Sequence, residues 1–174
     1  MCGILGVTNN NVNLDCFKSA LEKLNHRGPD GDGIYQDQKL FLGHKRLSII
    51  DVRNRADQPM VSECGNYVLV YNGEIYNYKE LSKKYLSDQR FKSYSDTEVL
   101  LYLLIEKGKS IIRELDGIFS FAFYSILDNE LLLARDRFGI KPLYYNMKEG
   151  ASLCFSSEIK GIHAIVGEKE LNEE

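Results

Sequence analysis

Hydrophobic residues along the chain follow a helical period in some segments and short β-rich runs in others. Leucine and phenylalanine residues at helical spacing predict a helix within 13–28, where a closing glycine is a stop signal. The segment 95–108 predicts a second helix, because Ser95 and Glu98 form an S-x-x-E capping box and Gly108 stands where the helix should end. Apolar residues cover most of the circumference of this second helix, so we expect it to be buried between layers.

Short β-rich runs account for most of the other hydrophobic positions. Within one of them, the pair Asn72–Gly73 is the strongest hairpin signal in the chain. Strands and helices do not alternate regularly, which argues against a doubly wound parallel sheet and predicts an α+β fold rich in antiparallel strands. The expected strands are 3–7, 33–36, 39–50, 117–125, 130–136 and 142–146, with a β-rich stretch over 66–78 and a strand followed by a helix over 152–165.

Composition and charge exclude several classes of protein. The 174 residues suit one domain, and 44% hydrophobic with 27% charged residues is typical of a globular fold. A net charge of -3 without a basic run argues against a nucleic-acid-binding protein. No apolar stretch is long enough to span a membrane, and the first residues do not resemble a signal peptide, so we expect a cytoplasmic protein with no membrane partner.

The cysteine and histidine positions predict no metal site. The four cysteines have no C-x-x-C spacing, and the three histidines add no metal-ligand spacing. The segment 29–33, "PDGDG", begins like a calcium loop, but Ile34 stands at the next ligand position and the closing acidic residue is missing. In a reducing compartment the cysteines should remain thiols.

Cys2 directly follows the initiator methionine. If Met1 is removed, Cys2 carries a thiol and a free α-amine, and an α-amine has a reference pKa of about 7.7–8.0. One residue would then hold both a nucleophile and a general base, as an N-terminal threonine can. The alternative is a chance cysteine at position 2, which is the simpler interpretation of this residue alone.

Four other features each allow a functional and a structural interpretation. Asn72 and Gly73 can form an oxyanion hole or a tight turn. Arg46 can hold a carboxylate in a bidentate clamp or be a solvated charge on a strand. Asp96, like Glu74, can bind a substrate ammonium group, although an acid in the first turn of a helix also complements the helix dipole. Alone, none of these residues decides between the two interpretations.

Nine motifs occur in an order that is known from one family. The chain resembles, over essentially its whole length, the glutamine amidotransferase domain of glutamine-hydrolysing asparagine synthetases. The motifs are "MCGI" (1–4), "HRGPDGDG" (26–33), "LGHKRLSIID" (42–51), "QPM" (58–60), "YNGEIYNY" (71–78), "SDTE" (95–98), "LDGIFSFAFY" (115–124), "ARDRFGIKPLYY" (134–145) and "FSSEIKGI" (155–162).

The resemblance implies a fold and a reaction. The fold is that of the N-terminal-nucleophile hydrolases, a four-layer αββα sandwich of two antiparallel sheets. The reaction is hydrolysis of L-glutamine to glutamate and ammonia through a thioester on Cys2. By the same resemblance, Asn72 and Gly73 would stabilise the oxyanion.

The resemblance also implies a substrate-binding set. Arg46 would hold the α-carboxylate of glutamine, and Asp96, helped by Glu74, would hold its α-ammonium group. The strand after Arg46 would line the glutamine site through three residues, Leu47, Ile49 and Ile50.

The chain lacks what asparagine synthetases use to activate aspartate. It has no Ser-Gly-Gly-x-Asp-Ser type loop and no G-x-x-x-x-G-K-[ST] loop, so we expect no cofactor in this chain. ATP and Mg²⁺ would belong to a synthetase domain. We therefore interpret residues 1–174 as the N-terminal part of a longer synthetase, with L-glutamine and a C-terminal synthetase domain or subunit as partners. The oligomeric state stays open, with a homodimer as one alternative.

Three other functions are left open. A synthetase-like amidotransferase that acts on a sugar in surface-polysaccharide synthesis would share this domain. A non-catalytic glutamine sensor would bind glutamine without turnover, but such remnants usually lose the nucleophile. A hydrolase of the same fold for other amides fits Arg46 and Asp96 less well, because the two together suit an amino-acid zwitterion.

Overall fold

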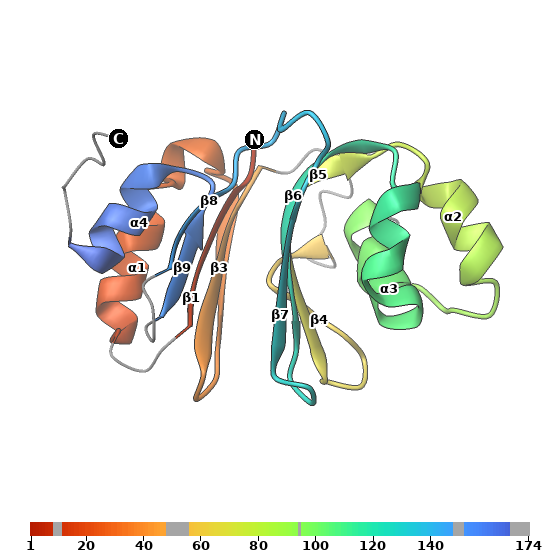
Figure 1. The fold of residues 1–174 in the computed structure, drawn as a ribbon, viewed down its shortest axis with the longest axis horizontal. Helices are drawn as coiled ribbons and strands as arrows, with labels where there is room; N and C mark the ends of the chain where they lie inside the picture. Colours follow the sequence, from red (N-terminus) through yellow and green to blue (C-terminus); the bar gives the residue numbers. More distant parts are fainter. Residues whose placement is uncertain (9–11, 48–55, 94, 148–151, 168–174) are drawn as a thin grey trace.

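Two stacked antiparallel sheets with helices on both outer faces make up the chain (Figure 1). The computed structural model describes residues 1–8, 12–47, 56–93, 95–147 and 152–167. The predicted α+β fold and its four αββα layers are confirmed. The first sheet has the order β2 (Gly31–Gln36), β3 (Leu40–Arg46), β1 (Gly3–Thr8), β9 (Leu153–Ser156), β8 (Tyr144–Met147), and the second β4 (Met60–Val61), β5 (Tyr67–Ile75), β6 (Gly117–Ser125), β7 (Glu130–Arg135).

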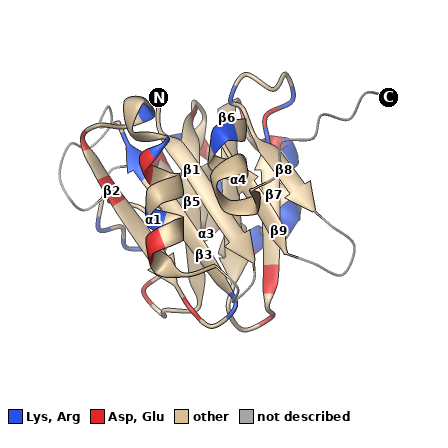
Figure 2. Ribbon diagram, turned by 90° about the vertical axis from the view of Figure 1, so that its left-hand side faces the viewer, with Lys and Arg blue, Asp and Glu red and all other residues tan. Residues whose placement is uncertain are grey.

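Helices cover the outer faces of the two sheets. Helices α1 (Leu14–Glu22) and α4 (Ile159–Val166) lie side by side over the first sheet (Figure 2). Helix α3 (Asp96–Lys107) packs on the second sheet, and α2 (Tyr78–Tyr85) packs on α3 (Figure 1). The prediction that the helix at 95–108 is buried between layers is therefore confirmed. Among the described residues, no helix combines the length and the apolar character that a membrane span needs.

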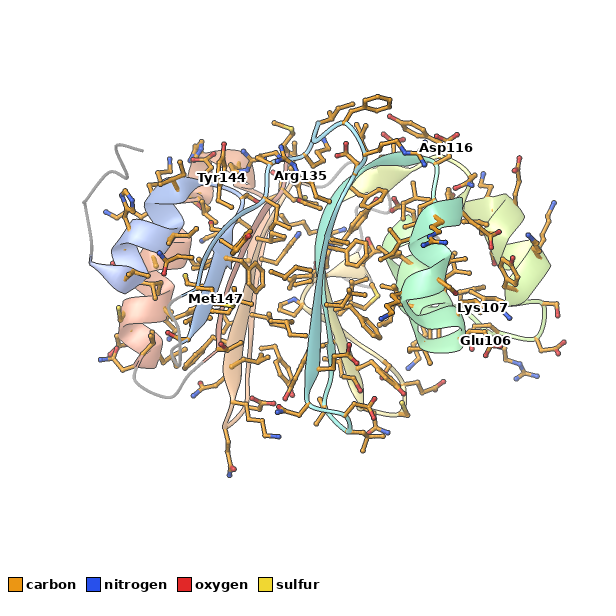
Figure 3. All side chains as sticks on the ribbon, in the orientation of Figure 1. Glu106, Lys107, Asp116, Arg135, Tyr144 and Met147 are labelled. Atoms are coloured by element: carbon orange, nitrogen blue, oxygen red, sulfur yellow. The ribbon has the colours of Figure 1, made fainter. Side chains whose placement is uncertain are left out.

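Apolar side chains fill the space between the sheets (Figure 3). Alternate residues of each strand face this inner layer, as the two-residue period of a strand requires. The opposite faces of the sheets bury their own apolar residues against the helices. The buried apolar residues of the inner layer include Ile4, Leu40, Leu42, Val68, Val70, Ala122, Tyr124 and Phe155.

The predicted capping box at the start of α3 forms only in part. The Ser95 hydroxyl accepts the Glu98 backbone N–H at 3.2 Å, as a capping serine should. The Glu98 carboxylate does not return to Ser95. It accepts the backbone N–H groups of Lys92 at 2.9 Å and Ser93 at 2.6 Å, so it orders the segment that leads into the helix.

The hairpin prediction at Asn72–Gly73 is wrong. Strand β5 runs straight through both residues, which pair with Ser120 and Phe119 of β6. A Cβ atom at position 73 would lie 2.3 Å from the carbonyl oxygen of Ile118. The glycine is therefore required by the close approach of β6, and not by a turn.

Two predicted element boundaries also differ from the structure. The β-rich stretch over 66–78 ends at Ile75, and α2 follows it, where we predicted no helix. The helix within 13–28 ends at Glu22, and a separate 3₁₀ helix covers Asn25–Arg27. The strand expected over 39–50 is described as far as Arg46, and positions 48–50 lie outside the described residues.

Candidate active site

The pairing of β1 with β3 directs three polar side chains into the inner layer at one end of the sandwich. Ile4 lies opposite His44, so Cys2, two residues earlier, comes next to Arg46. Ile4 faces the second sheet. Because residues two apart point to the same face of a strand, Cys2, His44 and Arg46 face the second sheet as well.

Strand β5 brings Asn72 to the same place from the second sheet. Val68 and Val70 face the inner layer, and Asn72 continues their row. A pocket of about 110 Å³ lies here, between the ends of the two sheets and the start of α3. Ile49 and Ile50 lie outside the described residues. The pocket contains all of the other residues that the sequence singled out: Cys2, Arg46, Leu47, Asn72, Gly73, Glu74 and Asp96.

The Cys2 sulfur lies against the backbone of Leu47. Its Sγ accepts the Leu47 N–H at 3.4 Å, and the thiol lies 3.7 Å from the Leu47 carbonyl oxygen. The sulfur thus has one backbone donor and one backbone acceptor beside it. The Leu47 carbonyl oxygen can accept a hydrogen bond from the thiol.

His44 lines the same pocket but is held as a neutral imidazole. Burial lowers its pKa to about 3, and its Nε2 bonds the Tyr71 carbonyl oxygen at 3.2 Å. A carbonyl oxygen only accepts, so Nε2 carries the hydrogen and donates it. His44 therefore connects the two sheets, and at neutral pH it adds no charge to the pocket.

Asn72 presents a buried amide donor to the pocket. The residue is 1% exposed, and among the described residues its Nδ2 has no hydrogen-bond partner. Leaving a buried polar group unpaired costs about 1–3 kcal/mol. A ligand that supplies an acceptor, such as an amide oxygen or an oxyanion, can offset this cost.

The backbone N–H of Gly73 points away from β6. Hydrogen bonds alternate along an antiparallel pair, and the Tyr76 N–H donates to the Asp116 carbonyl of the segment before β6 at 2.7 Å. Even-numbered residues of β5 therefore bond β6, and odd-numbered residues direct their N–H groups to the other edge. The partner on that edge, β4, pairs only with Val68 and Leu69, so it ends before Gly73.

Along this edge, side-chain oxygens accept hydrogen bonds from the backbone N–H groups on either side of Gly73. The Tyr71 N–H donates to Oε1 of Gln58 at 2.6 Å, and the Ile75 N–H donates to Oδ2 of Asp96 at 3.0 Å. The Gly73 N–H lies between them on the same edge. Together with the amide of Asn72, it gives the pocket two adjacent donors of the kind that stabilise an oxyanion.

The carboxylate of Asp96 is buried at the first position of α3. It is 4% exposed, and its Oδ2 also accepts the Tyr71 hydroxyl at 2.7 Å. Burial raises the pKa of Asp96, although the hydrogen bonds from Ile75, Tyr71 and the helix N-terminus oppose that rise. Glu74 lines the pocket as an exposed carboxylate, so two acidic side chains, Asp96 and Glu74, line the pocket.

Arg46 places a positive charge in the same pocket. The residue is 8% exposed, and its Nη1 donates to the Asp57 carboxylate at 2.5 Å. The Asp57 side chain is 57% exposed, so this ion pair reaches from the pocket to solvent. The pocket thus holds a cationic group and an anionic group, as the binding of a zwitterion requires.

The sequence analysis missed several pocket residues. Gln58 and Lys141 stand in the motifs "QPM" and "ARDRFGIKPLYY", which supported the resemblance but received no role. His44 and Thr97 stand within two residues of predicted ones, in "LGHKRLSIID" and "SDTE". Motif membership was therefore the available signal. No group of three or more possible metal ligands occurs among the residues that the structure describes.

Comparisons with known proteins find relatives over almost the whole chain. The asparagine synthetase [glutamine-hydrolyzing] of Brassica oleracea is 41% identical over 173 residues, which cover 94% of this chain and 28% of the relative. Asparagine synthetase B [glutamine-hydrolyzing] of Escherichia coli (strain K12) is 40% identical over 166 residues, which cover 93% of this chain and 30% of the relative. The chain thus spans less than a third of the length of these curated relatives.

A solved structure and a family model complete the comparison. The glutamine phosphoribosylpyrophosphate amidotransferase of B. subtilis has a TM-score of 0.81 and 23% identity, covering 98% of this chain and 44% of that one. This likeness confirms the N-terminal-nucleophile hydrolase fold. The family model described as "Glutamine amidotransferase domain" matches residues 1–174. The chain belongs to the glutamine amidotransferase domain family.

Proposed function

We propose that this chain hydrolyses L-glutamine to glutamate and ammonia through a thioester on Cys2. The observation that carries the proposal is the composition of one pocket. It holds a cysteine sulfur, a buried amide donor without a partner among the described residues, a buried arginine and a buried aspartate. These are the groups that a nucleophilic attack on the side-chain amide of an amino acid requires.

The first half of the reaction forms the thioester. Removal of Met1 frees the α-amine of Cys2, which takes the proton of the thiol. The sulfur then attacks the carboxamide carbon, and Asn72 and Gly73 donate hydrogen bonds to the oxygen as it becomes negative. The carbon–nitrogen bond breaks, the protonated amine gives its proton to the leaving nitrogen, and ammonia departs.

The second half releases glutamate. A water molecule attacks the γ-glutamyl thioester and gives one proton to the Cys2 amine. The same two donors stabilise the second oxyanion. When the carbon–sulfur bond breaks, the thiolate takes the proton back from the amine, and the enzyme returns to its starting state with glutamate as product.

Substrate recognition is assigned to the charged groups of the pocket. Arg46 holds the α-carboxylate of glutamine, and Asp96 with Glu74 holds the α-ammonium group. Arg46 bonds Asp57 in this structure, so binding of the substrate carboxylate reorganises that ion pair. Leu47 lines the site with its backbone, and we retain Ile49 and Ile50 as further lining residues on the resemblance alone.

The acceptor of the ammonia is a separate part of the proposal. The relatives are asparagine synthetases of which this chain spans 28% and 30%. We infer that the chain works with an ATP-dependent synthetase domain or subunit that binds ATP and Mg²⁺ and receives the ammonia. A sugar-amidating synthetase would need the same glutaminase, so the acceptor domain decides between the two.

The direct test measures glutamate release from L-glutamine by a sample whose mass shows that Met1 is absent. Glutaramate, which is glutamine without its α-ammonium group, serves as the comparison substrate, and its hydrolysis to glutarate is followed through the ammonia released. We expect glutamate release, and a kcat/KM at least about 10-fold lower for glutaramate, because a charge-assisted hydrogen bond contributes about 1.5–3 kcal/mol. Glutamine binding without release would instead support a sensor.

Asn72→Ala is expected to lower kcat by about 100- to 1,000-fold with a smaller change in KM, because the amide bonds the oxyanion more strongly than it bonds the amide oxygen of the bound substrate. Steady-state kinetics of glutamate release would show this. Ser120→Ala is the matched control, since its buried hydroxyl also lacks a described partner and lies opposite Asn72 on β6, outside the pocket lining. Equal losses in the two variants would contradict an oxyanion role for Asn72.

Asp96→Asn is expected to raise KM for glutamine by at least about 10-fold and to raise Tm at pH 7. Burial raises the pKa of Asp96. A raised folded-state pKa gives stability that is present below the unfolded pKa, about 3.9, and lost as pH rises through the folded-state value. Asparagine cannot ionise and so avoids that loss.

The control for Asp96→Asn is the same Tm comparison at low pH. The Tm difference between the variant and the parent chain should shrink at about pH 3, where Asp96 is protonated in both states of the parent chain. A lower Tm for the variant at pH 7 would show that the ionised carboxylate stabilises the fold. An unchanged KM would remove Asp96 from glutamine recognition.

A further inference from the structure

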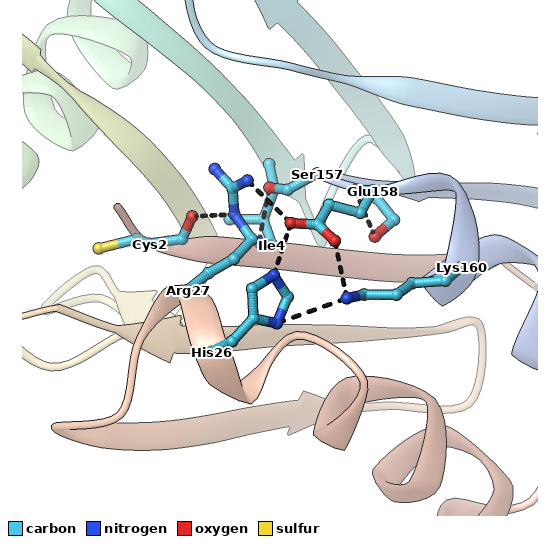
Figure 4. Close-up of polar contacts among 8 residues, drawn as sticks. Cys2, Ile4, His26, Arg27, Ser157, Glu158 and Lys160 are labelled. Carbon is cyan, nitrogen blue, oxygen red and sulfur yellow. Dashed lines mark hydrogen bonds and ion pairs between the residues drawn. The ribbon is translucent and has the colours of Figure 1, made fainter.

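The carbonyl oxygen of Cys2 is held by a buried arginine from the segment before β2. Arg27 Nε donates to this oxygen at 2.9 Å, and the Arg27 side chain is 8% exposed (Figure 4). Arg27 belongs to the 3₁₀ helix Asn25–Arg27. The bond therefore ties the residue that carries the nucleophile to a part of the chain outside the glutamine pocket.

Glu158 holds Arg27 in turn. Its Oε1 accepts Arg27 Nη1 at 3.0 Å, and Lys160 Nζ lies 3.0 Å from Oε2. His26 Nε2 lies 2.9 Å from Oε1. Burial raises the pKa of Glu158, but the hydrogen bonds from Lys160, Arg27 and His26 outweigh it and bring the pKa to about 2. The carboxylate is therefore ionised at any pH at which an α-amine can act as a base.

The segment that contains Glu158 also bonds the beginning of strand β1 directly. The Ser157 hydroxyl accepts the Ile4 N–H at 3.0 Å, and the Ser157 N–H donates to the Ile4 carbonyl at 2.9 Å. Ser157 thus binds Ile4, and Glu158 reaches Cys2 through Arg27 (Figure 4). Two consecutive residues before α4 fix the beginning of the chain.

This anchor matters because chain termini usually fray. After removal of Met1, Cys2 is the first residue, and no preceding peptide bond restrains it. The contacts of its sulfur with Leu47 are weak, since sulfur is a weak donor and acceptor. A hydrogen bond from a buried guanidinium to the Cys2 carbonyl is stronger and does not take part in the chemistry.

We propose that Glu158 is a positioning residue for Cys2: it holds the Arg27 guanidinium against the Cys2 carbonyl oxygen and so fixes the thiol and the terminal amine relative to Asn72 and Gly73. The proposal rests on the proposed glutaminase function and deepens it. Glu158 does not line the pocket, so it acts only through Arg27.

Loss of the Glu158 charge would leave Arg27 as a buried cation without its counter-ion. Arg27 Nη2 already has no partner among the described residues, so the guanidinium has few other contacts to hold it. A buried charge that loses its partner moves toward water or pulls water in. A displacement of about 1 Å at a reacting group can cost about 100-fold in rate.

The experiment compares Glu158→Gln with a matched control, Glu114→Gln. Glu114 is also a carboxylate with several partners, accepting Lys84 Nζ at 2.9 Å and the Tyr85 hydroxyl at 2.8 Å, and its pKa is also lowered. Its partners Lys84 and Tyr85 belong to α2, which lies on the opposite side of the sandwich from α4 (Figure 1). If Glu158 only stabilised the fold, the two variants would behave alike.

We expect Glu158→Gln to lower kcat for glutamate release by about 10- to 100-fold while KM changes by less than about threefold. Glu158→Asp, which keeps the charge, should recover part of the loss, and Glu114→Gln should keep the parent kcat. In a double-mutant cycle with Arg27→Lys, the effects should be smaller together than their sum, because both act through one bond. Full activity of Glu158→Gln, or additive effects in the cycle, would overturn the proposal.

A second measurement does not depend on glutaminase activity. Amide hydrogen exchange of the peptide 2–8 should become at least about 10-fold faster in Glu158→Gln and stay unchanged in Glu114→Gln, because the anchor limits local opening of β1. Faster exchange in Glu158→Gln, together with no glutamate release by the parent chain, would support the positioning role of Glu158 and contradict the glutaminase function. Unchanged exchange would overturn the anchor whatever the activity.

Discussion

Replacement of Cys2 by alanine should abolish glutamate release, with kcat lower by at least about 10⁴-fold. In the proposed reaction the sulfur is the atom that bonds the substrate carbon, and the pocket offers no second thiol among its described lining residues. The oxyanion donors and the binding groups stay in place, so glutamine should still bind. Kinetics of glutamate release and calorimetric titration with glutamine would measure the two effects separately.

Cys16→Ala is the matched control for this prediction. Cys16 is another partly buried free thiol, in α1, where its Sγ lies 3.9 Å from the Ala164 carbonyl oxygen. We expect this variant to keep the parent kcat. More than about 1% residual activity in Cys2→Ala would show that the reaction does not pass through a thioester on this residue.

Retention of Met1 should lower kcat by about 10⁴-fold in a chain that keeps every other residue. The peptide bond to Met1 converts the Cys2 amine into an amide, which cannot accept a proton, and loss of a general base costs about 10²- to 10⁴-fold. Met1 also lines the pocket, so it occupies space beside the nucleophile. Both effects act on the chemical step.

A cleavable N-terminal extension gives the cleanest measurement of this effect. The same preparation is assayed before and after a protease exposes Cys2, with intact mass as the record of the terminus. Activity should appear in proportion to the cleaved fraction. Full activity before cleavage would rule out the terminal amine as the base and would require a base from the rest of the chain.

Most strands and the helix α3 were predictable because their signals are local. Ser95 caps α3, and Gly108 ends it with φ +58, a conformation that suits glycine. The pair Asn72–Gly73 shows the limit of such signals. Its local chemistry fits a hairpin turn, and only the approach of β6, more than 40 residues later in the chain, makes it part of a continuous strand.

Helix α2 was missed for a related reason. Its sequence, "YKELSKKY", buries only Leu81 and otherwise presents polar or aromatic residues, so few apolar positions mark it as a helix. Packing on α3 selects the helix. Intrinsic preferences are small, and tertiary contacts override them in such segments.

The resemblance found seven of the pocket residues, whereas it gave no role to the residues that support them. The side chain of Gln58 bonds the backbone of Tyr71, and Glu158 bonds Arg27 across 131 sequence positions. A glutamine and a glutamate on the ends of elements carry no local signal of these bonds. Only the folded chain shows which distant groups they satisfy.

The open edge of β5 bears on aggregation. An unpaired strand edge can recruit a strand from another molecule, which needs a row of alternate N–H and carbonyl groups. Gln58 and Asp96 cover the N–H groups of Tyr71 and Ile75, so Gly73 offers a single gap in this row. A single N–H group can bond one oxygen atom but cannot pair with a strand. The edge is therefore protected against self-association, and the Gly73 N–H can still donate to a ligand.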